Sequence, residues 1–291
     1  MQTQGGDLPE LAVAVLSLGA ELGLEDAVAS LLQQSPAPEV VVVNSGGGAP
    51  RARLEAAGLA VTVVDRSDRL FPGAVRNLGV AATRAPWVGF LAADCIALPG
   101  WVAGRLAAHR AGAHAVASLL VNPYERNRSA AAAALLLHHR RMAHTPRSER
   151  LHMGLSFSRE LLERLGPFRD DVRIGEDSEF EQRMRAAGVR AVWSDAVRTA
   201  HRNPRSPRAL VREQYARGSR RRQAREQLGP SVGGLPVGTL IDAGRAWRGT
   251  RLETDTAQRR NLRRGWPLLA PGALAYAAGS FVARPRPSRE R

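Results

Sequence analysis

Two adjacent carboxylates, Glu176 and Asp177, directly follow Gly175 and precede a helical pattern. Phe180 and Met184 are spaced i, i+4, which gives the apolar stripe of a helix packed on a core. The acids therefore lie where a loop meets a helix N-terminus, and backbone N–H groups and the helix dipole favour negative charge there. The rest of the chain supplies possible partners for these acids. Alone, the pair also fits an N-cap followed by a solvated acid.

The elements that would position these acids follow an alternating pattern. Apolar runs of strand length occupy 11–18, 39–43, 60–64 and 87–92. Helical spacing occupies the intervening 25–34, 51–57 and 74–82. This alternation predicts an α/β fold with a doubly wound, mostly parallel sheet flanked by helices. Further along, helices are expected at 101–111, 130–143, 159–165 and 205–228, and strands at 153–158 and 189–193.

Polar residues stand at the ends of three of these strands. Ser17, Asn44 and Asp94 fall where the strands finish, and glycines 46–48 would let backbone approach a ligand. Ligands of such sheets bind beyond the carboxyl ends of the strands. Taken alone, a single aspartate at a strand end, such as Asp94, is best explained as a turn former. By residue type alone, His201, after the last strand, is more often a surface histidine than a metal ligand.

Charge divides the chain unevenly. Residues 1–200 contain 22 arginines against 21 acids, whereas residues 201–291 contain 20 against 6. A nearly neutral body with a basic C-terminal extension predicts a polyanionic partner, either anionic lipid or nucleic acid. The length suits one large domain, or one with an appendage, and the single cysteine, Cys95, fits a reducing compartment. The first ten residues show no signal-peptide pattern.

The uncharged stretch 266–283 is at the lower limit of length for a membrane span. It contains Pro267 and Pro271 and is flanked by Arg264 and Arg284, which favours an interfacial or re-entrant segment over a crossing helix. A plain buried helix is the alternative.

Several motifs occur in an order that resembles the family 2 glycosyltransferases of GT-A fold. They are EVVVVNSGGG (39–48), GAVRNLGVAATRAPWVGFLAADCIALPGWV (73–102), LHMGLSFSRELLERLGPFRDDVRIGED (151–177), His201 and QYARGSRRR (214–222). The resemblance extends from about Leu11 to Gln223. It implies a GT-A glycosyltransferase domain over 8–204, followed by an arginine-rich, partly apolar extension over 205–291.

The resemblance implies transfer of a sugar from a nucleotide-diphosphate sugar to a hydroxyl acceptor, with inversion at the anomeric carbon. Asp177 matches the catalytic base, and Glu176 would orient the site. Asp94 and His201 would hold Mn²⁺ or Mg²⁺. The expected nucleotide-sugar site comprises Ser17, Asn44, Arg76, Asn77, Asp94, Gly154 and Ser156. Arg76 could equally be a surface charge.

The chain departs from the family pattern at three positions. The DxD motif reads Ala92-Ala93-Asp94, so its first carboxylate is absent. Asn44 replaces a common aspartate, and Leu18 a frequent aromatic residue. These changes leave open a catalytically impaired nucleotide-sugar-binding scaffold.

The expected setting is cell-envelope polysaccharide or lipid-linked glycan synthesis on the cytoplasmic membrane face. The extension 205–291 would bind anionic lipid, and 122–150 would contact a glycan or lipid-linked acceptor. A nucleic-acid-binding protein is the less favoured alternative, because the arginine-rich stretch 205–228 offers only Tyr215 for base stacking.

Overall fold

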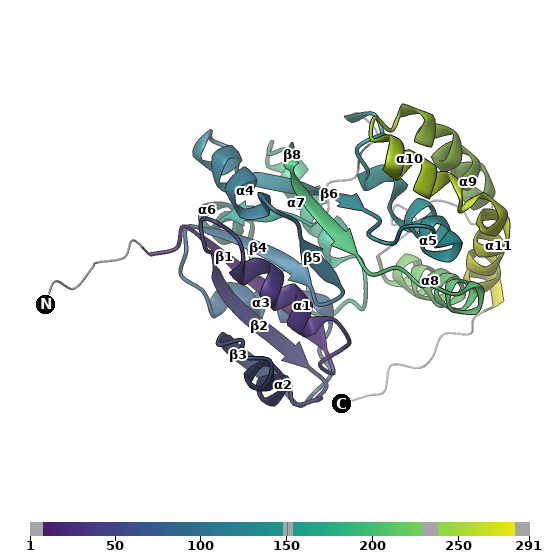
Figure 1. Cartoon of the computed structure of the whole chain (residues 1–291). Helices are drawn as coiled ribbons and strands as arrows, with labels where there is room; N and C mark the ends of the chain where they lie inside the picture. The colour runs from purple at the N-terminus through teal and green to yellow at the C-terminus, as the bar shows by residue number, and fades with distance from the viewer. Residues whose placement is uncertain (1–7, 148–149, 151–153, 229–237, 283–291) are drawn as a thin grey trace, which may run out of the picture. The chain divides into compact units, whose positions relative to one another are not determined.

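The computed structural model describes residues 8–147, 150, 154–228 and 238–282 (Figure 1). The chain forms two compact units. The first contains the described residues of Met1–Leu119, His152–Asp171 and Glu179–Ala200. The second contains those of Leu120–Leu151, Val172–Ser178 and His201–Arg291.

An eight-stranded sheet, in the order β3-β2-β1-β4-β7-β6-β8-β5, forms the frame of the first unit. Its parallel part consists of β1 (Leu11–Leu18), β2 (Glu39–Ser45), β3 (Thr62–Arg66) and β4 (Trp87–Ala92). The short β7 (Ser156–Ser158) pairs antiparallel with β4 and with β6 (Ala115–Val121). The remaining strands are β8 (Val192–His201) and β5 (Cys95–Ala97). The predicted fold class is therefore confirmed.

Helices cover both faces of this sheet because successive side chains of each strand point to opposite sides. Val13 and Val15 of β1 enter a core shared with α1 (Leu24–Leu32), α2 (Pro50–Ala56) and α4 (Trp101–Arg110). Ala14 enters the opposite core, which is built with α3 (Pro72–Ala81), α6 (Arg159–Leu165) and α7 (Glu176–Ala186). In the second core, Phe180 of α7 stacks on Phe168 with ring centroids 4.3 Å apart. The predicted stripe of Phe180 and Met184 is therefore buried against the sheet.

Several predicted boundaries were wrong. The strand expected at 189–193 begins instead at Val192 and continues to His201. Gly188, at φ +76°, closes α7, and the Val189 N–H donates back to the Met184 carbonyl, so Val189 still belongs to the helix end. The helix expected at 130–143 is α5 (Arg128–His138), followed by a 3-10 turn at His139–Arg141. The strand predicted at 60–64 lies at 62–66 in the structure. Of the strand predicted at 153–158, the described part is a strand only at 156–158. The strand β6 was not predicted.

The second unit is mainly helical in its described residues. Its core is formed by α5, α8 (Pro207–Leu228), α9 (Gly238–Gly249), α10 (Thr256–Arg263) and α11 (Trp266–Val282). The helices α8 and α11 touch backbone to backbone. A Cβ atom on Gly218 would lie 2.0 Å from the Tyr276 carbonyl oxygen, and one on Gly279 would lie 2.0 Å from that of Tyr215. Only glycine permits this separation.

The stretch 266–283 is a helix through Val282, the last residue that the structure describes there. One face of α11, including Leu269 and Ala273, is buried in the unit's core. Large apolar residues on the rest of the helix are exposed, by 60% at Trp266, 56% at Leu274 and 61% at Phe281. Among the described residues, no helix combines the length and apolar character needed to span a bilayer.

Candidate active site

The carboxyl ends of the parallel strands are organised by one buried amide. Asn44 accepts a hydrogen bond from the Ala20 N–H at 2.9 Å and donates to the Gly47 carbonyl at 2.8 Å. It also donates to the Asp65 carboxylate at 2.8 Å. Asn44 therefore joins the loops after β1 and β2 to the end of β3. Its neutral amide can make both kinds of contact, which an aspartate at this position could not.

Two further residues, Ser17 and Asp65, place polar groups at this edge of the sheet. Ser17 pairs in register with Asn44, and its buried hydroxyl has no hydrogen-bond partner within the described part of the chain. Asp65, the register partner of Asn44 on β3, supplies an exposed carboxylate. Sequence reasoning missed Asp65, although its position in the strand-end pattern of Ser17 and Asn44 could have revealed it.

A possible metal-binding group lies where β5 and β8 are neighbours in the sheet. One ligand atom each of Asp94, Cys95 and His201 lies within 4.8 Å of the others. The Cys95 thiol donates to the Asp94 carboxylate at 3.4 Å, and His201 is the last residue of β8. Desolvation, followed by the negative charge of Asp94, raises the pKa of Glu21 above its ordinary value. From the sequence, Cys95 was taken only as a sign of a reducing compartment and Glu21 was not considered; only Asp94 and His201 were expected to hold a metal.

The donor set of carboxylate oxygen, thiol sulfur and imidazole nitrogen suits borderline divalent cations better than Mg²⁺, which prefers oxygen ligands. We therefore expect Cys95→Ser to lower the affinity for Zn²⁺ roughly tenfold while changing that for Mg²⁺ by less than about twofold. Competition titrations with a fluorescent chelator, without any sugar donor, would measure both affinities. An equal loss for the two ions would show that Cys95 acts only through packing.

Glu176 and Asp177 occupy the first turn of α7. Glu176 is buried, whereas Asp177 is partly exposed. The Asp177 carboxylate accepts from the Ser178 backbone N–H at 2.8 Å, and this contact holds the side chain at the helix N-terminus.

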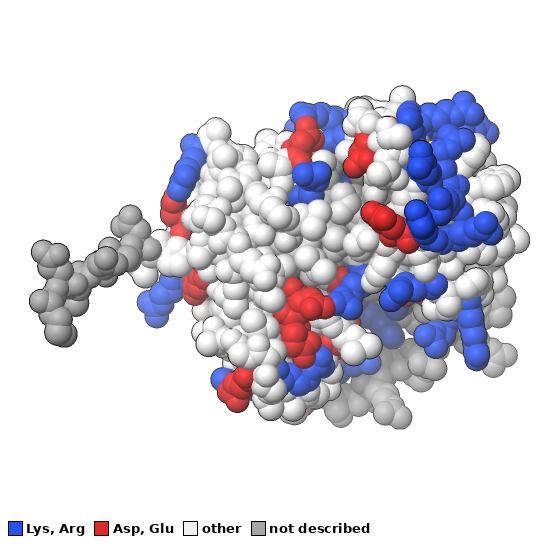
Figure 2. Space-filling model, in the orientation of Figure 1, with Lys and Arg blue, Asp and Glu red and all other residues white. Residues whose placement is uncertain are grey.

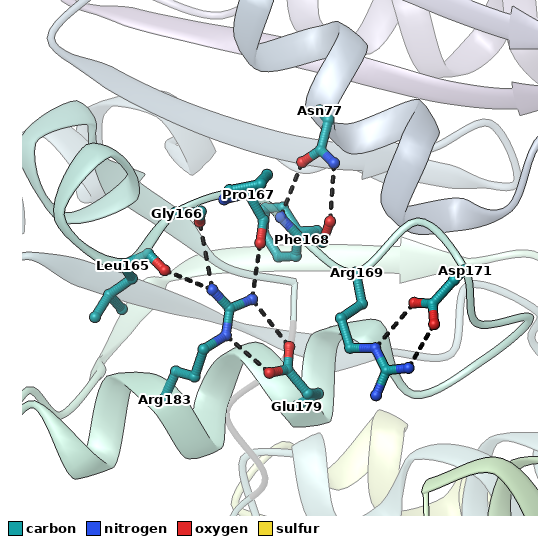
Figure 3. A network of polar contacts seen from close by, with 9 residues as sticks. All are labelled: Asn77, Leu165, Gly166, Pro167, Phe168, Arg169, Asp171, Glu179 and Arg183. Atoms are coloured by element: carbon teal, nitrogen blue, oxygen red, sulfur yellow. Dashed lines mark hydrogen bonds and ion pairs between the residues drawn. The ribbon is translucent and has the colours of Figure 1, made fainter.

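The loop that leads toward these acids is fixed by side chains from two helices (Figure 3). Asn77 of α3 donates to the Phe168 carbonyl and accepts from the Phe168 N–H, both at 2.9 Å. Arg183 of α7 donates to the carbonyls of Leu165 and Pro167. Both ends of the Asn77 amide are thus used in positioning this loop.

Arg76, the neighbour of Asn77, places its guanidinium 5.7 Å from the ring centroids of both Phe90 and Phe168. It is neither buried nor fully exposed. The faces of these two aromatic rings attract the positive charge of the Arg76 guanidinium.

Side chains of Arg105 and His109 in α4 make hydrogen bonds to the positions expected to border the sugar, Gly154 and Ser156. The fully buried Arg105 donates to the Gly154 carbonyl at 2.7 Å, to the Val116 carbonyl at 2.7 Å and to the Ser156 hydroxyl at 2.9 Å. The Ser156 hydroxyl in turn lies 2.8 Å from Nε2 of His109.

His109 completes this network as a neutral ring. Burial is the main cause that lowers its pKa to about 4. Its Nδ1 faces the Ala113 carbonyl at 2.7 Å and must carry the proton, so Nε2 accepts from Ser156. Sequence reasoning missed both side chains, because helical periodicity in 101–111 does not distinguish a buried arginine from a solvated one.

Together, the mostly parallel sheet and the polar residues at its strand ends define an α/β protein with a ligand site beyond the carboxyl ends of its strands. The family model for glycosyl transferase family 2 matches residues 13–163, more than half of the 291 residues. The chain belongs to this family.

Solved structures show the same fold. The mannosyltransferase PcManGT from Pyrobaculum calidifontis, in complex with GDP-Man and Mn²⁺, is 19% identical with a TM-score of 0.55, over 94% of this chain and 88% of that one. TarS 1–349 from S. aureus, in complex with UDP-GlcNAc, is 18% identical with a TM-score of 0.50, over 93% and 90%. No curated protein sequence matches.

Family membership makes the protein a glycosyltransferase that uses a nucleotide-sugar donor. The group of Asp94, Cys95 and His201 could hold a divalent cation.

Proposed function

We propose that the protein transfers a sugar with inversion, in a single displacement at the anomeric carbon. The position of Asp177 in the first turn of α7, partly exposed and tied to the Ser178 N–H, carries this proposal. Asp177 takes the proton from the acceptor hydroxyl as that oxygen attacks. Glu176, buried beside it, orients the helix start.

The donor is bound along the strand ends. Ser17 faces the nucleotide base, and Asn44 shapes the same part of the site through the strand-end loops that its buried amide joins. Arg76 and Asn77 act from α3, with Asn77 working through the loop that it holds. Gly154 and Ser156 border the sugar. Asp94 and His201 hold a divalent cation, which supplies Lewis-acid stabilisation of the departing diphosphate.

A donor screen followed by product analysis tests this assignment. The protein is incubated with a panel of nucleotide sugars and a hydroxyl acceptor, with and without Mn²⁺, and the anomeric configuration of the product is read by NMR. Inversion is the expected result. Retention of configuration would contradict the single displacement. Donor binding without transfer or donor hydrolysis would favour the impaired scaffold suggested by Ala92 in place of the first DxD aspartate.

The acceptor is proposed to be a glycan or lipid-linked hydroxyl of the cell envelope, met at the cytoplasmic membrane face. In this proposal a glycosyltransferase domain over 8–204 carries the chemistry, 122–150 contacts the acceptor, and 205–291 binds the membrane. Figure 2 shows arginine side chains gathered over the helices of the second unit. The exposed ones in 201–291 include Arg208, Arg212, Arg245, Arg248, Arg251, Arg260 and Arg264.

The apolar side chains of α11 give this surface a second means of attachment. Trp266, Leu274 and Phe281 recur at intervals of eight and seven residues, which places them on one side of the helix. An exposed apolar stripe near basic residues is typical of a helix that lies in the membrane interface.

Replacing Trp266, Leu274 and Phe281 together by glutamate is expected to abolish flotation with vesicles containing anionic lipid. Because all three side chains are exposed, the fold should survive the change. The control is Ile241→Glu, which changes another exposed apolar residue of the second unit, on α9. Flotation that persists in the triple variant would place the attachment elsewhere. DNA retention that exceeds vesicle binding across salt concentrations would favour the nucleic-acid alternative.

A further inference from the structure

A chain of side-chain amides leads from a backbone carbonyl to His201 within the second unit. Asn122 donates through Nδ2 to the Tyr124 carbonyl at 3.2 Å. Asn203 donates through Nδ2 to Oδ1 of Asn122 at 3.1 Å. Oδ1 of Asn203 then lies 3.1 Å from Nδ1 of His201. Both amides are buried, which makes each of these contacts costly to lose.

The first hydrogen bond of this series, from Asn122 to the Tyr124 carbonyl, determines the direction of the others. A backbone carbonyl can only accept, so the Asn122 group that faces Tyr124 must be its NH₂. The Asn122 oxygen therefore faces Asn203 and accepts from its NH₂, which turns the Asn203 oxygen toward the imidazole. Because that oxygen is also only an acceptor, Nδ1 of His201 must carry the hydrogen.

This assignment determines what the other ring nitrogen can do. A neutral imidazole has one N–H and one lone pair, so a hydrogen on Nδ1 leaves the lone pair on Nε2. A metal ion binds the nitrogen that has the lone pair. The ring is further restrained by His138 of α5, whose buried ring packs edge-on against it with centroids 4.5 Å apart.

We propose that Asn203, oriented by Asn122, is a positioning residue that fixes the tautomer of His201 and so presents Nε2 to the divalent cation. The inference rests on the proposed role of His201 as a metal ligand. Partners of this kind, which bind the non-ligating nitrogen of a metal-bound histidine, typically change metal affinity about 10- to 100-fold when removed.

The test uses the full chain in two measurements. ¹⁵N NMR of histidine-labelled, metal-free protein reports the tautomer of His201, and titration with Mn²⁺ alone reports affinity. Asn203→Leu removes the acceptor at nearly constant volume. We expect it to populate the Nε2–H tautomer and to weaken Mn²⁺ binding about 10- to 100-fold. Asn203→Asp retains an acceptor oxygen, so it should keep the Nδ1–H tautomer and bind Mn²⁺ at least as tightly as the unchanged protein.

Asn261→Leu, which removes another buried amide of the second unit, is the matched control and should change neither measurement. Equal damage from Asn203→Leu and Asn203→Asp would overturn the inference, because it would show that Asn203 only packs. An unchanged tautomer in Asn203→Leu would also overturn it. Mn²⁺ affinity that is unaltered in His201→Ala would instead refute the metal role of His201, while the metal-free spectra would still test the amide chain.

Discussion

Asp177→Asn is expected to lower the rate of sugar transfer by about 10²–10⁴-fold, the usual contribution of a general base. The amide keeps the size of the side chain, and its oxygen can still accept from the Ser178 N–H, so the helix start should be preserved. It cannot take a proton at neutral pH. Donor affinity should therefore stay within about threefold of the original, because the base acts on the acceptor and not on the nucleotide.

Single-turnover kinetics with the best donor, together with donor binding by calorimetry, would separate these effects. Asp171→Asn is a suitable control, since Asp171 is an exposed acid whose ion pair with Arg169 lies at the surface (Figure 3). It should change neither measurement. A variant of Asp177 that loses donor binding but turns over normally would refute the assignment.

Arg105→Met is expected to lower the free energy of unfolding by about 2–5 kcal/mol and to weaken donor binding at the same time. The substitution leaves the carbonyls of Gly154 and Val116 without their buried donor. It also removes the guanidinium that lies 3.8 Å from the Trp101 ring centroid. Once released, Gly154, which stands at φ +61°, would no longer be held at the edge of the proposed sugar site.

Denaturant unfolding and donor KM would be compared with those of Arg159→Met. Arg159 of α6 also donates to backbone carbonyls, those of Ala85 and Thr83, and none of the hydrogen bonds that its side chain makes within the described residues reaches the Gly154–Ser156 segment. The control should therefore lose stability while its donor KM stays near the original value. Equal changes of KM in both variants would indicate that Arg105 contributes to stability alone.

Much of the fold could be predicted because the parallel strands are buried on both faces. Such strands appear in the sequence as continuous apolar runs, and 39–43 is one of them. The polar β8 was misplaced because only three of its ten residues are buried and its sequence shows no such run. Its pairing depends on neighbours that are distant in the sequence.

The candidate site residues were predicted partly from their places at strand ends and partly from the family motifs. Ser17, Asn44 and Asp94 were identified because they end strands. Other contacts join residues that are distant in the sequence, so no local pattern encodes them. Examples are the hydrogen bonds from Asn77 to the Phe168 backbone and from Arg105 to the Ser156 hydroxyl. The catalytic roles and the division into 8–204 and 205–291 stay predictions.

The glycine contact between α8 and α11 has a consequence for how the second unit meets a charged partner. A flexible arginine-rich segment would lose conformational entropy when it binds a charged partner, and that loss would lower its affinity. Here Gly218 and Gly279 fasten the two helices together beforehand, and Arg222 donates to the Phe281 carbonyl across them. The guanidinium groups of α8 are therefore held on a rigid surface. The strength with which this surface binds a charged partner should depend more on the spacing of the partner's charges than on their number.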